Sequence, residues 1–149
     1  MKDMFMFMPV WARKLHNLTD KFITNKLKEQ GISYKYVKYV MFLYDNKDHN
    51  QNQICDNLHY DKAHTSRVLS VLEQDGLVEK IIDPQDNRKH IYNLTERGSE
   101  LAKKVKQYML EWQNIILSEV SEEEIAACKS CATKIIDNAT NKIKEIDNV

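Results

Sequence analysis

The segment from Leu77 to Leu94 constrains the fold most, because two strand-like stretches flank a turn in a chain that otherwise favours helices. Residues 77–82 and 90–94 are rich in β-branched and aromatic side chains, which is typical of strands. The stretch between them holds residues that favour a turn, namely Pro84, Asp86 and Asn87. We therefore expect a β-hairpin with an exposed cationic tip that carries Arg88, Lys89 and His90.

A short helix is predicted directly before this hairpin, from an N-cap at Asp61 to a left-handed stop at Gly76. Its apolar side is expected to be buried and consists of Thr65, Val68, Leu69 and Leu72. The opposite side faces solvent and carries Lys62, Ala63, Ser66, Arg67 and Ser70. Another short helix over residues 51–58 precedes it, so the pair forms a helix-turn-helix that the hairpin makes winged.

Longer helices are predicted on both sides of this head. An apolar stripe indicates a first helix that runs to about Gln30 and stops at Gly31; it consists of Trp11, Leu15, Leu18 and Phe22. Ser33 is the expected N-cap of the next helix, and residues 45–50 follow as a polar loop.

Two further helices are predicted after the hairpin. Thr95 caps the first, which has an apolar stripe of about five turns, and a capping box over residues 121–124 begins the last. The last helix carries an apolar seam that includes Cys128, and such a seam requires a partner helix. The terminal helices are therefore expected to form a dimerisation region, because one small head cannot bury both of them.

The expected fold class is mainly α with one β-hairpin, in a single domain over residues 1–149. The winged helix-turn-helix head covers about 34–94, and the long N- and C-terminal dimerisation helices cover about 10–30 and 95–148. The apolar run at the start of the chain is too short for a signal or membrane-spanning segment, and the three cysteines lack the spacing of a secreted disulfide framework. These features predict a cytoplasmic protein.

Charge gives no general argument for binding nucleic acid. The chain has 22 basic and 22 acidic residues, and residues 50–98 hold six Lys or Arg against eight acids, a net of −2. DNA binding must then depend on where the cations lie. The first forty residues carry eight basic against three acidic groups, a net of +5, so Lys35 and Lys38 are expected to add positive potential beside the head.

The sequence from Asp61 to Val78, followed by Asp86-Asn87-Arg88 and by Leu94-Thr95-Glu96-Arg97-Gly98, resembles the MarR family of bacterial transcription regulators. The shared features are the Ser-Arg pair of the recognition helix, the Leu-Glu-x-x-Gly-Leu-Val exit, the Asp-x-Arg wing and the Leu-Thr-x-x-Gly helix start. They occur in the same order and at similar spacing, and the flanking helices also agree. The resemblance thus covers nearly the whole chain.

The resemblance implies a dimeric winged helix-turn-helix repressor, or less often an activator, that binds a pseudo-palindromic double-stranded operator and releases it on meeting a small molecule or an oxidant. Ser66 and Arg67 match the base- and phosphate-contacting pair, Arg88 matches the wing arginine that enters the minor groove, and Asp86 matches the acid that braces it. Two departures are Thr65, where the family has an apolar residue, and Ile81-Ile82, where it often has an arginine. The second departure predicts fewer phosphate contacts at the base of the wing.

The complete set of candidate DNA contacts is Lys62, Ala63, His64, Ser66, Arg67, Ser70, Arg88, Lys89, Lys35 and Lys38. Asp86 is expected to pair with and orient Arg88, because an acid that faced phosphate would repel it. A candidate effector cleft has the borders Tyr36, Tyr39, Phe42, Tyr108 and Trp112, although aromatic residues at helical spacing are more often core.

No metal or cofactor is expected. The five histidines contain no i, i+4 pair, and Cys128-x-x-Cys131 has no second Cys or His pair for zinc. We interpret Cys128 as a buried small hydrophobe. The resemblance disfavours peroxide sensing, because the oxidant-sensing branch of the MarR family uses a cysteine near the start of the first long helix and this chain has none between Trp11 and Gln30. An enzyme is not expected, since no nucleophile–base set or glycine-rich phosphate loop is present.

Two functions from different classes remain. The first is a homodimeric, sequence-specific DNA-binding repressor relieved by a small-molecule effector, in which residues 61–75 enter the major groove and the hairpin reaches the minor groove. The second is a winged-helix module for protein–protein contact without specific DNA binding, which the neutral overall charge favours.

Overall fold

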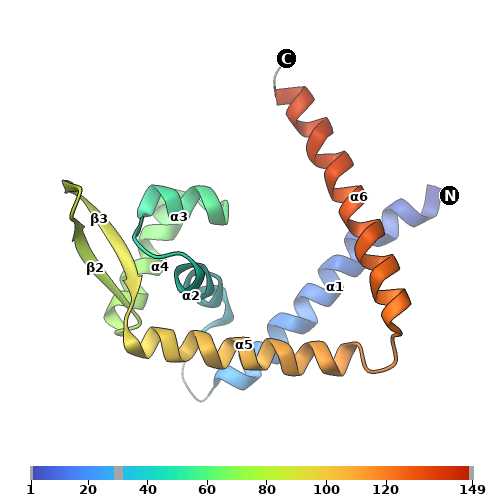
Figure 1. The fold of residues 1–149 in the computed structure, drawn as a ribbon, viewed down its shortest axis with the longest axis horizontal. Coiled ribbons are helices and arrows are strands. Elements are labelled where there is room, and N and C mark those ends of the chain that lie inside the picture. Colours follow the sequence, from blue (N-terminus) through green and yellow to red (C-terminus); the bar gives the residue numbers. More distant parts are fainter. Residues whose placement is uncertain (1, 29–31, 148–149) are drawn as a thin grey trace. The chain divides into compact units, whose positions relative to one another are not determined.

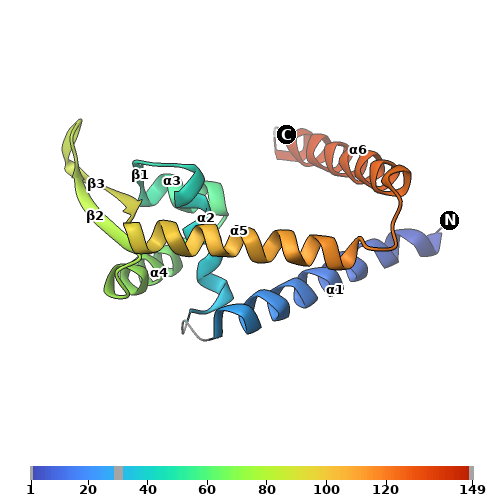
Figure 2. The same cartoon turned by 60° about the horizontal axis from the view of Figure 1, so that its bottom comes forward.

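The computed structural model describes residues 2–28 and 32–147, and side chains from Pro9 onward apart from that of Lys35. The chain divides into two units, the first ending at Trp112 and the second beginning at Gln113. The elements are α1 (Lys2–Leu27), α2 (Tyr34–Asp45), β1 (His49–Asn50), α3 (Gln51–Leu58), α4 (Lys62–Gln74), β2 (Val78–Asp83), β3 (Asp86–Leu94), α5 (Glu96–Ile116) and α6 (Glu122–Asp147). Figures 1 and 2 show α3, α4 and the hairpin β2–β3 side by side in the first unit. Within the described ranges, no helix combines the length and the apolar character that crossing a membrane requires.

The sheet is antiparallel and has three strands in the order β1-β3-β2. The predicted hairpin is confirmed, with Val78 opposite Leu94 and Ile82 opposite His90. The prediction that residues 45–50 form only a polar loop is wrong, because His49 and Asn50 pair with Tyr92 and Ile91 as the third strand. A two-residue strand has no periodicity of its own, so only its distant partner defines it.

The turn of the hairpin lies at Pro84-Gln85, where the Asp83 carboxylate accepts a hydrogen bond from the Gln85 N–H at 2.8 Å. The prediction that Arg88, Lys89 and His90 form the tip is wrong in position, because strand β3 already begins at Asp86. These three side chains project from the strand instead. The strands extend closer to the turn because their ladder reaches the Asp83–Asp86 pair.

The helix-turn-helix is confirmed in detail. Ile54 and Cys55 of α3 are buried, and the buried side of α4 consists of Thr65, Val68, Leu69 and Leu72. Gly76 ends the segment with a φ of 65°. Thr65 is tolerated in the core because its Oγ1 shares a hydrogen bond of 3.2 Å with the Tyr39 hydroxyl, which satisfies both groups.

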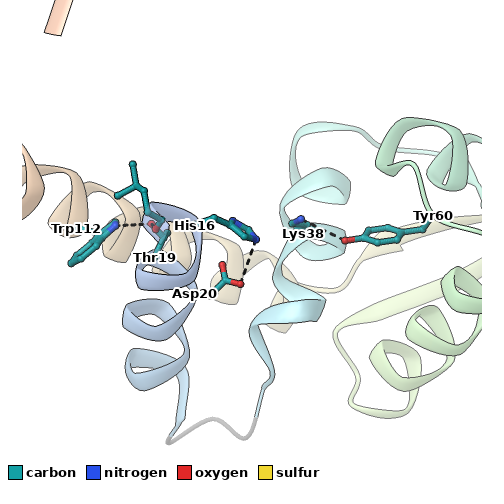
Figure 3. Close-up of polar contacts among 7 residues, drawn as sticks. His16, Thr19, Asp20, Lys38, Tyr60 and Trp112 are labelled. Atoms are coloured by element: carbon teal, nitrogen blue, oxygen red, sulfur yellow. Dashed lines mark hydrogen bonds and ion pairs between the residues drawn. The ribbon is translucent and has the colours of Figure 1, made fainter. Parts of the chain in front are cut away.

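Helix α1 begins at Lys2 and contains Pro9, whereas the sequence predicts its start near residue 10. Proline removes one backbone donor and so weakens a helix without always ending it. The predicted stop at Gln30-Gly31 lies outside the described residues. Toward its C-terminal part α1 packs on α5: the Phe22 and Trp112 rings stack with centroids 4.8 Å apart, and the Trp112 Nε1–H donates to Thr19 Oγ1 at 2.9 Å (Figure 3).

The caps of the last two helices are as predicted. The Thr95 hydroxyl accepts the Gly98 N–H at 3.0 Å and donates to the Gly76 carbonyl at 2.8 Å, so it connects the glycine that follows α4 to the start of α5. Ser121 and Glu124 form the capping box of α6.

Helix α6 has no buried residue, and Cys128 and Cys131 are exposed. The prediction that Cys128 is buried is therefore wrong for the single chain. Its apolar neighbours on the predicted seam, such as Ile143 at 56% exposure, are also uncovered.

Candidate nucleic-acid interface

The start of helix α4 is held by two hydrogen bonds. The Asp61 carboxylate accepts from the His64 N–H at 2.7 Å, as the sequence predicts for an N-cap. Gln51, the first residue of α3, donates from Nε2 to the carbonyl of Lys62 at 3.0 Å, a link that the sequence pattern did not reveal. Together these bonds fix the first turn of α4 relative to the helix that precedes it.

The exposed face of α4 contains all five residues predicted to face solvent: Lys62, Ala63, Ser66, Arg67 and Ser70. Arg67 Nε donates to the Ala63 carbonyl at 3.2 Å, which holds the guanidinium along the helix surface while leaving its terminal nitrogens without a recorded partner in the described part of the chain. Such an arm can donate two parallel bonds to a base edge or a phosphate.

His64 differs from the other candidates on α4. It is half-buried, and its ring lies 4.9 Å from that of Tyr60 and 6.3 Å from that of Tyr39. Its side chain therefore packs between the helices rather than on the exposed face.

The wing presents Arg88 and Lys89 as exposed cations. The prediction that Asp86 pairs with the Arg88 guanidinium is wrong, because the carboxylate instead accepts from the Arg88 backbone N–H at 3.1 Å and pairs with the Lys89 ammonium at 3.1 Å. The Arg88 N–H, followed by the Lys89 ammonium, holds the pKa of Asp86 below its ordinary value. Asp86 thus shapes the backbone at the start of β3, while the Arg88 side chain stays available.

Of the two lysines predicted beside the head, only Lys38 lies within the described side chains. Its Nζ is 3.5 Å from the Tyr60 hydroxyl and 6.0 Å from the centre of the Tyr60 ring (Figure 3). Tyr60 belongs to the turn between α3 and α4, so Lys38 adds positive charge next to the start of α4. The side chain of Lys35 lies outside the described part of the structure.

The aromatic residues predicted to border an effector cleft mostly fill the core or pack on neighbouring helices. Tyr39 is fully buried, so the prediction that it lines an open cleft is wrong. Trp112 stacks on Phe22, and Phe42 meets the edge of the His49 ring at 5.2 Å. Tyr36 and Tyr108 are half-buried against the same core. Helical aromatic spacing here reflects packing.

The cap at Asp61 gives a prediction. Its hydrogen bond from the His64 N–H is the main cause that holds the pKa of Asp61 below the ordinary value of 3.8. A carboxyl group with a lowered folded-state pKa stabilises the fold above its ordinary pKa, and that contribution is lost as the pH falls through the lowered value. Asp61→Ala should therefore lower the melting temperature at neutral pH, and the deficit should shrink as the pH falls below 3.8.

Thermal unfolding followed by circular dichroism at a series of pH values measures this deficit. Asp56→Ala is the matched control, because Asp56 is an exposed acid of α3 with no recorded hydrogen bond or ion pair in the described residues. A deficit for Asp61→Ala that stayed constant over the whole pH range would show that the carboxylate does not cap α4.

Comparisons with known proteins agree with this geometry. The MarR family model matches residues 32–90, which include the whole helix-turn-helix and most of the wing. A MarR transcriptional regulator from Methanosarcina mazei Go1 has a similar structure, with a TM-score of 0.80, 25% identity, and coverage of 91% of this chain and 98% of that chain. Over residues 32–90 the chain is thus similar to the MarR family.

Sequence relatives of this chain are named as transcriptional regulators. The HTH-type transcriptional regulator BilQ of Clostridioides difficile strain CD3 is 36% identical over 86 residues, 58% of this chain and 58% of its own length. BilQ of Clostridium symbiosum strain WAL-14163 is 27% identical over 69% of this chain and 72% of its own length. The match to the first regulator thus spans less than two thirds of that protein.

The MarR fold has also been solved with DNA. The S. aureus MepR–DNA complex aligns with a TM-score of 0.78 and 24% identity over 88% of this chain and 97% of that chain. The two BilQ relatives are named as transcriptional regulators, which agrees with the expectation that the chain is not an enzyme.

Proposed function

We propose that this protein is a sequence-specific DNA-binding transcriptional regulator. The observation that carries the proposal is the exposed face of α4, where Ser66 and Arg67 stand on a helix fixed at its start by the Asp61 cap and the Gln51 bond. A fixed helix with a polar outer face fits the major groove, and an exposed arginine on the adjacent hairpin fits a neighbouring minor groove.

Charge placement supports the same function in a chain without net charge. Three of the eight acids in residues 50–98 accept hydrogen bonds within the head: Asp61 caps α4, Asp86 binds the backbone of β3, and Asp83 binds the turn of the wing. The cations Arg67 and Arg88 remain exposed. A local positive surface can therefore exist although residues 50–98 carry a net charge of −2.

A homodimer is part of the proposal. Helix α1 leaves Leu15 at 49% exposure, and α6 exposes Ile136 at 63% and Ile146 at 57%. Apolar side chains repeated along helices normally lie against a partner helix. Two recognition helices related by a twofold axis would then contact half-sites about 34–36 Å apart on a pseudo-palindromic operator.

The dimer makes Ile143→Asp informative. A buried carboxylate without a partner strongly destabilises an apolar interface, so this variant should sediment as a monomer at concentrations where the wild type is a dimer. Asn141→Asp is the matched control because it adds the same charge to an exposed polar position of the same helix. Sedimentation velocity measures both. If the Ile143→Asp variant is still a dimer, this face of α6 is not part of the interface.

The direct test of the function is fluorescence anisotropy of a labelled duplex from upstream of the gene, with excess competitor DNA. Saturation at two chains per duplex, lost when the inverted repeat is scrambled, is the expected result. Repression and its relief by a small-molecule effector form the finer part of the proposal and rest on the family resemblance. Equal affinity for target and competitor would instead support the alternative, a winged-helix module for protein contact.

A further inference from the structure

A polar pocket lies between the first turn of α3 and the root of the wing. Its volume is about 320 Å³, and it is lined by Gln51 and Asn52 on one side and by Lys80, Lys89 and His90 on the other. Of its lining residues only Lys89 is among the predicted DNA contacts, because the walls of the pocket come from segments far apart in the sequence.

The face of the hairpin that contributes to this pocket is set by its register. Lys80 lies opposite Tyr92, and Ile82 lies opposite His90, so these side chains share one face. Val78 is on that face by strand alternation, and it is buried in the core of the head. Lys80 and His90 therefore extend the inner face of the sheet beyond the core, toward the helices.

The pocket is cationic although the head is not. No Asp or Glu lines it, and neither Lys80 nor His90 has a recorded hydrogen bond or ion pair within the described residues. The pocket on the other side of the wing, of about 410 Å³, is lined by Asp48 and Asp83, and Lys89 borders both pockets. Only the pocket at Lys80 therefore has cations without an acid in its lining, and such a lining attracts an anion.

One lining residue connects the pocket to the start of α4. Gln51 lines it and at the same time donates through Nε2 to the carbonyl of Lys62, the first residue of α4. An anion held there lies between the start of α3 and the hairpin proposed to reach the minor groove, and Gln51 links this position to the first turn of the helix proposed to read the major groove. In duplex DNA the sugar–phosphate backbone separates these two grooves.

We propose that this pocket binds one phosphodiester group of the DNA backbone, with Lys80 supplying positive charge and the His90 imidazole and the Asn52 amide supplying hydrogen-bond donors. The inference rests on the proposed function and adds residues to it. A phosphate bound in this pocket also gives the protein a contact with the DNA backbone at the base of the wing, where Ile81 and Ile82 carry no positive charge. The contact positions the head on DNA without reading sequence.

The test combines a salt titration with phosphate ethylation interference, using full-length protein and a duplex enriched by the wild type from a random library. Each lost phosphate contact flattens the log–log dependence of affinity on salt by about 0.9. Lys80→Ala should therefore flatten it by about 0.9 per subunit, and one phosphate per half-site should become insensitive to ethylation. Lys80→Arg should retain both signals.

Lys104→Ala is the matched control, because Lys104 is an exposed lysine of α5, which contributes no residue to the candidate interface. It should leave slope and footprint unchanged. If the wild type enriches no duplex, the proposed DNA-binding function fails. If the wild type enriches a duplex and Lys80→Ala keeps the full salt slope and the same ethylation footprint, the proposed phosphate-binding pocket is contradicted and the proposed DNA-binding function is not.

Discussion

Replacing Arg67 with alanine is expected to remove most of the preference of the protein for its operator over competitor DNA. The Arg67 guanidinium is held by the Ala63 carbonyl on the exposed face of α4, so its terminal nitrogens are already positioned to donate outward. A bidentate arginine–guanine contact contributes about 1–3 kcal/mol of discrimination, and a symmetric dimer makes it twice. Competition anisotropy with target and scrambled duplexes measures the loss.

Arg67→Lys is the informative companion. Lysine keeps the positive charge but lacks the planar fork of arginine, so it should preserve the salt dependence while losing sequence preference. An Arg67→Ala variant that still discriminates target from scrambled duplex would exclude Arg67 from base recognition. Wild-type discrimination by Arg67→Lys would show that the planar fork of arginine is not needed for base recognition.

Replacing Gly98 with alanine is expected to destabilise the fold more than any other single glycine change in the described residues. A Cβ at Gly98 would collide with the Leu77 carbonyl oxygen and lie 3.0 Å from its carbonyl carbon and 3.2 Å from Leu94 Cδ2. The obstructing atoms include backbone, and the Leu77 carbonyl also accepts the Thr95 N–H at 3.1 Å. The expected loss is about 3 kcal/mol or more in the free energy of unfolding.

Gly76→Ala separates collision from conformational strain. Gly76 has a φ of 65°, but a Cβ there would meet only the Arg97 Nη1 at 3.9 Å, so its cost is the left-handed backbone alone, about 1–2 kcal/mol. Urea unfolding of both variants measures the two losses. If Gly98→Ala proved as stable as Gly76→Ala, the close passage of α5 against the exit of α4 would be incorrect.

The segment 61–76 could be predicted from the sequence because the interactions that begin and end its helix are local. Asp61 is an N-cap with its acceptor three residues from its donor, and Gly76 ends the segment in the left-handed conformation. The buried positions of α4 follow the helical period, and each of those predicted is buried. Interactions between residues this close in the chain can be predicted from the sequence alone.

The features that the sequence did not reveal depend on long-range partners. Strand β1 exists because Asn50 pairs with Ile91, and the Gln51 bond to Lys62 joins two helices. The sequence predicts that Asp86 pairs with the Arg88 guanidinium, but in the folded hairpin its partners are the Arg88 backbone N–H and the Lys89 ammonium. The cationic pocket at Lys80 arises only when the wing and α3 come together.

The aromatic residues and Cys128 show what helical periodicity does not decide. Tyr39 follows the helical period equally well as a core residue and as the wall of a cleft, and its hydrogen bond to Thr65 decides for the core. Cys128 follows the period of the α6 seam, but the single chain leaves α6 without a buried residue. Periodicity identifies a face of a helix and leaves open what covers it.

The central claim is that α4 and the wing recognise a specific DNA sequence, and selection of duplexes from a random library by the full-length protein tests it most directly. We predict that the bound pool converges on an inverted repeat whose half-sites lie about one helical turn apart. A pool that keeps the composition of the starting library, under salt conditions where the protein still binds duplex DNA, would contradict the claim.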